Sequence, residues 1–136
     1  MSRTSAVAVT ALLAVAALFV SGCGAADGGS ASRLVASEEF AGAVARPGVV
    51  TINVHVPDEG SIRGTELWIP FDAVEARRDE LPSPATPLAV YCRSGRMSAI
   101  AVETLSRLGY EEVVELDGGM VAWERGGGQL LPPRGP

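Results

Sequence analysis

The sequence predicts an α/β domain of three layers, in which a mostly parallel central sheet is flanked by helices. Three observations lead to this prediction. Apolar, often β-branched runs at residues 49–54, 88–91 and 113–116 are typical of buried strands, and segments of helical periodicity separate them. The run 88–91 leads through a tight loop directly into one of these segments. Without its N-terminal segment, the 136-residue chain still has enough residues for one domain with a modest core.

The first 22 residues have the layout of a secretory signal peptide. Arg3 supplies a positive charge, and residues 6–20 are apolar or small apart from one threonine. This run is too short to span a membrane comfortably. The tetrapeptide Val20-Ser21-Gly22-Cys23 resembles the lipobox of bacterial lipoproteins. The resemblance implies a lipid on Cys23 that anchors the protein outside the cytoplasmic membrane, in the periplasm or cell envelope. A plain signal peptide with a coincidental cysteine is the alternative.

Composition divides the rest of the chain into three parts. Residues 23–36 are rich in Gly, Ala and Ser, as in a flexible tether that would follow the lipid anchor. Residues 37–130 carry the alternating pattern and form the predicted domain. Residues 131–136 follow a Gly-rich stretch and are expected to form a loose tail.

The first helix and strand of the domain have local signals. Ser37 is predicted to cap a helix that ends near Val44, because two glutamates follow it in the first turn. Pro47 and Gly48 form a turn before the strand at 49–54. The polar stretch 57–65 is expected to be a loop.

A second helix is predicted from Asp72 to about Glu80, with Ala73, Val74 and Ala76 facing the core. The segment Pro82-Ser83-Pro84 ends it.

A third helix is predicted from Ser98 to Leu108, with Gly109 in the left-handed position after its end. A short last helix at 120–124 follows the strand at 113–116. Its Trp123 is expected to close the core.

Cys92 is the first candidate for chemistry. It ends a buried strand and precedes a helix, so backbone N–H groups and the positive end of the helix point into the intervening loop. Such a loop favours an anion, including the thiolate that is the nucleophilic form of cysteine. An inert core thiol is the alternative. Gly95 and the arginines at 93 and 96 favour the reactive thiol.

Two motifs resemble those of one known family. Tyr91-Cys92-Arg93-Ser94-Gly95-Arg96-Met97-Ser98 closely resembles the active-site loop of single-domain rhodanese-like proteins, which are sulfurtransferases. Leu116-Asp117-Gly118-Gly119-Met120-Val121-Ala122-Trp123 resembles the second signature of that family. The resemblance covers roughly residues 37–130.

The resemblance implies sulfur transfer through a persulfide on Cys92, with no cofactor. A small anionic donor such as thiosulfate supplies the sulfur, and a thiol or cyanide accepts it. The loop that binds the donor comprises Arg93, Ser94, Gly95, Arg96, Met97 and Ser98. Arg96 is the preferred donor contact over Arg93, although either side chain can simply face solvent.

Two positions depart from the pattern of the family. Asn53 and His55 stand where its members usually carry an Asp and an Arg, and both are expected to lie near the site as accessory residues. The segment Gly60-Ser61-Ile62-Arg63-Gly64 lacks a histidine that is common there. These departures leave two alternatives for His55, a direct catalytic role or a structural hydrogen bond.

Other functions are weighed against this one. Phosphatases and arsenate reductases also place a cysteine before a helix. Their motif has an Arg after five intervening residues, whereas the loop here has Ser at position 98. A weakly catalytic or non-catalytic sulfur carrier is the second alternative. A net charge of -5 without a dense basic cluster argues against nucleic acid, and a single histidine without companion ligands gives no metal site.

Overall fold

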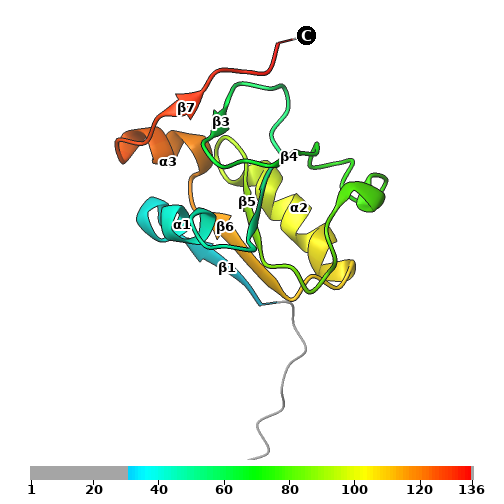
Figure 1. Ribbon diagram of the computed structural model, residues 1–136. Helices are drawn as coiled ribbons and strands as arrows, with labels where there is room; N and C mark the ends of the chain where they lie inside the picture. The colour runs from blue at the N-terminus through cyan, green and yellow to red at the C-terminus, as the bar shows by residue number, and fades with distance from the viewer. Residues whose placement is uncertain (1–30, 136) are drawn as a thin grey trace, which may run out of the picture.

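The computed structural model describes residues 31–135 and contains a five-stranded, fully parallel sheet (Figure 1). The strands lie in the order β1, β6, β5, β2, β4. Their bounds are Ala31–Val35 for β1, Val50–Asn53 for β2, Leu67–Trp68 for β4, Leu88–Tyr91 for β5 and Glu112–Leu116 for β6. Strand β5 is therefore central, and the predicted parallel α/β architecture is confirmed.

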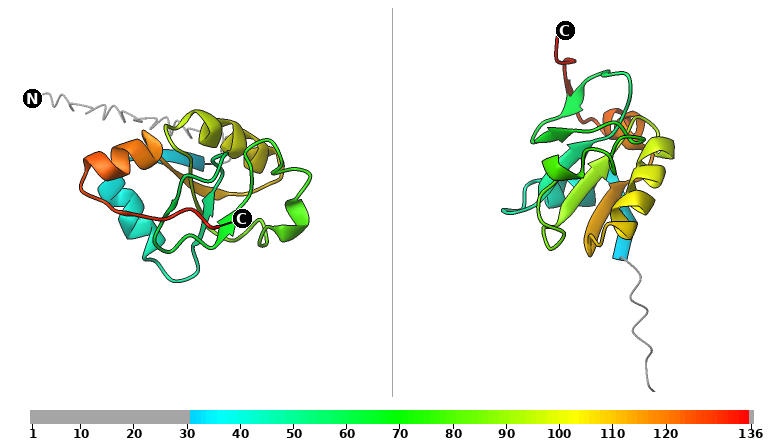
Figure 2. Two further views of the ribbon diagram at one scale, coloured as in Figure 1. Left: turned by 90° about the horizontal axis from the view of Figure 1, so that it is seen from above. Right: turned by 90° about the vertical axis from the view of Figure 1, so that its right-hand side faces the viewer.

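Helices cover both faces of the sheet (Figures 1 and 2). Helix α2, Arg96–Arg107, packs on one face, and helices α1, Ser37–Val44, and α3, Gly119–Arg125, pack on the other. All four residues of β5 are buried, with Leu88 and Val90 on the α2 side and Ala89 and Tyr91 on the α1 side. This burial on both faces explains why the strand is apolar throughout.

The N-terminal boundary of the domain differs from the expected one. Residues 31–35, expected within the tether, form the edge strand β1, which pairs in parallel with β6 along its whole length. The predicted signal peptide and Cys23 lie outside the described residues. Within residues 31–135, no helix has the length and apolar character needed to cross a membrane.

The C-terminal segment is also more structured than expected. Leu130–Leu131 forms β7, which pairs antiparallel with β3, Ser61–Ile62, inside the stretch expected to be a loop. Arg134 contacts Asp58 at 3.3 Å and lies over the ring of Trp68. Residues 131–134 therefore lie at the end of the sheet at which β5 leads into α2 (Figure 1).

The prediction of a helix from Asp72 to about Glu80 is wrong. Those residues form successive turns that end in a short 3-10 helix, Arg78–Glu80. Val74 is buried as expected, but Ala76 is exposed. With so little apolar surface to bury, this segment lacks the packing that normally stabilises a helix.

Two helix starts also differ from the predictions. Ala36, not Ser37, is the capping residue of α1, and no side chain caps that helix. Helix α2 begins at Arg96, two residues before the predicted Ser98. The left-handed Gly109 after α2 is confirmed.

Candidate active site

The loop from Cys92 to Gly95 connects the central strand to the N-terminus of α2. Gly95 precedes the helix with a φ of 97°, a conformation that residues with side chains rarely adopt. This turn brings the Gly95 N–H to 3.1 Å from Cys92 Sγ, to which it donates a hydrogen bond. The predicted orientation of loop amides toward the sulfur is present at this position.

Cys92 itself lies deep in the protein. The residue is 1% exposed and belongs to the core cluster on the α2 side of the sheet. Its sulfur nevertheless has polar neighbours, because Ser98 Oγ lies 3.4 Å away in addition to the Gly95 amide. The burial resembles that of a structural thiol, whereas the hydrogen bond that the Gly95 N–H donates suits a sulfur that accepts hydrogen bonds. In the contact with Ser98, the thiol is the donor and Ser98 Oγ accepts.

The start of α3 fixes the backbone of this loop. Met120 N–H donates to the carbonyl of Cys92 at 2.9 Å, and Val121 N–H donates to that of Arg93 at 3.0 Å. Gly119 makes this approach possible: a Cβ built on it would lie 2.4 Å from the Cys92 carbonyl oxygen. The two sequence motifs are therefore in direct contact, and the second one supports the first.

Glu115 is the site residue that the sequence interpretation missed. It lies on β6, is 8% exposed, and accepts a hydrogen bond of 2.6 Å from Ser98 Oγ. Burial raises the pKa of this carboxyl, the Ser98 hydrogen bond lowers it, and the nearby charge of Asp117 raises it, with a raised pKa as the result. The available signal was a glutamate inside the run predicted as a strand at 113–116, whose other residues are apolar.

The raised pKa of Glu115 predicts a specific dependence of stability on pH. The folded chain holds this proton more tightly than the unfolded chain does. The resulting stability is complete below the unfolded pKa and is lost as pH rises through the folded pKa. Relative to wild type, Glu115→Gln should gain free energy of unfolding as the pH rises above the ordinary pKa of a glutamate, as measured by urea unfolding at a series of pH values. A difference that does not change with pH would contradict this.

The other loop residues lie closer to solvent. Arg93, Ser94 and Arg96 are exposed, and Met97 is half-buried against the core. The Arg93 guanidinium lies 3.6 Å from the carboxylate of Glu59, while Arg96 forms no ion pair with any residue in 31–135. Arg96 is therefore the more available positive charge at the mouth of the loop.

Asn53 and His55 are both buried at the same end of the sheet, and their side-chain hydrogen bonds are made with residues other than Cys92. Asn53 donates to the carbonyl of Gly60 and accepts from the His55 backbone N–H, which shapes the preceding loop. The His55 ring contacts Glu59, the same carboxylate that faces Arg93. Through Glu59, His55 is thus linked to the active-site loop.

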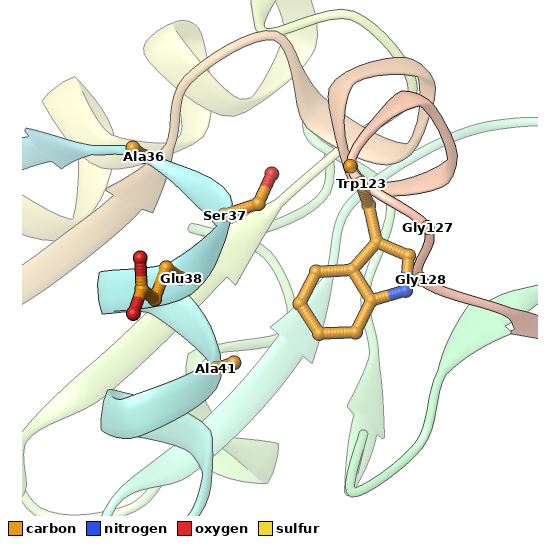
Figure 3. Close-up of a pocket in the computed structure, with 8 residues that line it drawn as sticks. Ala36, Ser37, Glu38, Ala41, Trp123, Gly127 and Gly128 are labelled. Carbon is orange, nitrogen blue, oxygen red and sulfur yellow. The ribbon is translucent and has the colours of Figure 1, made fainter.

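Trp123 is half-buried instead of closing the core. Its ring packs against the cluster on the α1 side and lines an open groove between α1 and the glycines after α3 (Figure 3). The indole N–H donates to the carbonyl of Gln129 at 3.2 Å. This groove lies on the side of the sheet that α1 and α3 cover, whereas Cys92 belongs to the core cluster on the α2 side.

Metal ligands do not gather at this site or elsewhere in the described part of the chain. No group of three or more His, Cys, Asp or Glu side chains there could hold a metal ion. Cys92 is the one free cysteine among residues 31–135. The loop and its surroundings present a single thiol, hydroxyls, backbone amides and a buried carboxyl.

Comparisons with known proteins agree with the motifs. Residues 37–125 match the rhodanese-like domain family. A sulfurtransferase of Allochromatium vinosum is 33% identical over 90 residues, which cover 64% of this chain and 82% of that protein. The crystal structure of a rhodanese-related protein from Thermoplasma volcanium superposes with a TM-score of 0.63 at 27% identity. It covers 73% of this chain and 97% of the other.

A more distant likeness concerns the phosphatase alternative. A protein of unknown function from Rhodopseudomonas palustris, described as a possible tyrosine phosphatase, superposes with a TM-score of 0.59 at 24% identity. The match covers 74% of this chain and 86% of that one. Similarity at this level shows a common fold and carries no information about the reaction.

Proposed function

Because the chain belongs to the rhodanese-like family, we propose that it is a sulfurtransferase that carries sulfur as a persulfide on Cys92. The donor is a small anion of the thiosulfate type, and the acceptor is a thiol or cyanide. The observation that carries this proposal is the 3.1 Å hydrogen bond from the Gly95 N–H to the cysteine sulfur.

The reaction proceeds in two displacements. The Cys92 thiolate attacks the outer sulfur of thiosulfate, the bond between the two donor sulfurs breaks, and sulfite leaves with the bonding electrons. The acceptor thiolate or cyanide then attacks the outer sulfur of the persulfide and restores the Cys92 thiolate. The Gly95 amide and the N-terminus of α2 stabilise the negative sulfur in both states.

The exposed arginines support an anionic donor. Cys92 is itself almost fully covered, so the donor has to approach through the mouth of the loop, where Arg93 and Arg96 reach solvent. A positive charge there attracts the donor before its outer sulfur meets Sγ. Since Glu59 already faces Arg93, Arg96 is the principal donor contact.

Arg96→Ala is accordingly expected to raise the KM for thiosulfate about tenfold, because a charge-assisted contact to an anion is lost. Arg93→Ala should raise it less, since that guanidinium already has a carboxylate neighbour. Steady-state kinetics at constant ionic strength measure both values. Arg125→Ala, on the exposed end of α3, is the control for a general loss of positive charge. An equal increase in all three variants would contradict the assignment.

Sulfur loading tests the proposed function most directly. Mass spectrometry of the intact domain after incubation with thiosulfate should show one added sulfur atom on Cys92, and cyanide should remove it. A protein that never gains this mass, whatever the donor concentration, is not a thiosulfate sulfurtransferase.

A sulfur-carrier role is the second candidate. It is favoured because Asn53 and His55 stand where the family usually has an Asp and an Arg, and His55 here contacts Glu59 instead. A carrier accepts sulfur from a partner protein and turns over thiosulfate slowly. Asn53→Asp combined with His55→Arg should then increase thiosulfate turnover strongly. An unchanged rate in the double variant argues against this role.

The N-terminal motif supports placement at a membrane. A lipid on Cys23 would hold the domain on the outer side of the bacterial cytoplasmic membrane, with residues 24–30 as the tether. Metabolic labelling with a fatty acid tests this placement, and Cys23→Ala should abolish both the label and the membrane association.

A further inference from the structure

We propose that Glu115 receives the proton of Cys92 through the hydroxyl of Ser98 and thereby positions and activates the nucleophile. This inference rests on the proposed function, because it takes Cys92 as the attacking group. The hydrogen bond of Glu115 is with Ser98, which in turn contacts the sulfur, so Glu115 is a positioning residue that acts through Ser98.

The geometry at Ser98 places the three groups in a chain. Ser98 is fully buried, and its Oγ lies 3.4 Å from Cys92 Sγ and 2.6 Å from Glu115 Oε1. The carbonyl of Gly95 lies 3.1 Å from the same oxygen. A hydroxyl has one proton to donate, so it cannot serve the carboxylate, the carbonyl and a thiolate at the same time.

Counting protons gives two arrangements of equal charge. In the first, the Cys92 S–H donates to Ser98 and the Ser98 O–H donates to the Glu115 carboxylate. In the second, the protonated Glu115 donates to Ser98, and Ser98 donates to the Cys92 thiolate. One proton moves along each of the two hydrogen bonds between these states, and no proton is exchanged with solvent.

Burial favours such an exchange over independent ionisation. Two negative charges this close together in the interior would repel each other and lose their hydration. Holding one charge on the pair avoids that cost while still making a thiolate available. Burial raises the pKa of Glu115, which favours the protonated carboxyl that the second arrangement needs.

The surrounding charges do not supply another route. Asp117 is exposed in the turn that directly follows β6, and it adds negative charge. Arg96 on α2 and Arg93 in the loop are both exposed, and Arg93 faces Glu59. On the neighbouring β1, Leu34 is paired with Glu115, and Arg33 is bound by Glu39. Within the described residues, Ser98 is the hydrogen-bonding side chain that joins Glu115 to Cys92.

Alkylation of Cys92 by iodoacetamide as a function of pH tests the proposal, because its rate follows the thiolate population. If the two groups are coupled, the alkylation rate of the wild-type protein should rise twice with increasing pH, with a plateau between the two rises. The reason is that a coupled pair loses its two protons in separate steps. Glu115→Gln should give a single rise. Ser98→Ala should also give a single rise, but at higher pH, because the carboxylate stays ionised and the hydroxyl donor is gone.

Glu112→Gln is the matched control. Glu112 lies on the same strand but is exposed and paired with Arg46, so this variant should keep the two-step profile. A single rise in the wild-type protein overturns the proposal even where a variant fails to fold. A two-step profile that persists in Glu115→Gln also overturns it.

Sulfur loading separates this inference from the proposed function. A wild-type protein that gains sulfur from thiosulfate but shows a single rise retains the function and lacks the relay. A protein with the two-step profile that never gains sulfur retains the relay as a property of the thiol and is not a thiosulfate sulfurtransferase.

Discussion

Cys92→Ser is expected to lower thiosulfate:cyanide sulfur transfer by roughly 10³-fold or more, because the covalent intermediate can no longer form. A serine hydroxyl is a poor nucleophile toward sulfane sulfur, and the structure places no other thiol among residues 31–135. Cyanolysis kinetics measure the loss, and intact-mass spectrometry should show no sulfur adduct on the variant.

Cys23→Ser provides the matched control for this experiment, since it removes the other cysteine of the chain. The soluble domain that carries Cys23→Ser should transfer sulfur at the wild-type rate. The thermal unfolding midpoint of Cys92→Ser should stay close to that of wild type, because the two side chains are nearly the same size. Substantial turnover in a folded Cys92→Ser protein would remove Cys92 from the mechanism.

Gly119→Ala is expected to cost about 3–5 kcal/mol in the free energy of unfolding, a large fraction of the stability of a domain this size. Two effects add at this position. Gly119 has a φ of 57°, which side chains disfavour. The new Cβ would also lie 2.4 Å from the Cys92 carbonyl oxygen and 2.6 Å from the Arg93 carbonyl carbon. Both contacts are with backbone, so no side-chain rotation relieves them.

The same substitution should reduce activity in the fraction that stays folded, because α3 must move away from the active-site loop. Gly42→Ala is the control with the opposite sign. Gly42 is exposed in α1, its added Cβ meets nothing within 4 Å, and alanine should stabilise the helix by about 0.5–1 kcal/mol. Chemical denaturation measures both variants. Equal unfolding free energies for Gly119→Ala and wild type would show that α3 does not constrain the loop as described.

Three segments of the chain differ from their predicted structure, each for its own physical reason. Residues 31–35 have a mixed composition and form a strand because β6 offers a free edge to pair with. The segment 72–80 has helix-forming residues, but among them Val74 alone is buried. The tail at 131–134 is held by pairing with β3 and by contacts to Asp58 and Trp68, which are remote in sequence.

The sequence alone determined the central strand, the loop of Cys92 and the left-handed glycine after α2, because each depends on residues that are neighbours in the chain. The tertiary structure decided what surrounds the sulfur. Glu115 is 23 residues from Cys92 in the sequence, and it lies near Cys92 because β6 pairs in parallel with β5. Helix α2 then places Ser98 between the side chains of Glu115 and Cys92. A carboxyl acquires a raised pKa from burial, and burial is a property of the folded chain, which no local pattern of residues specifies.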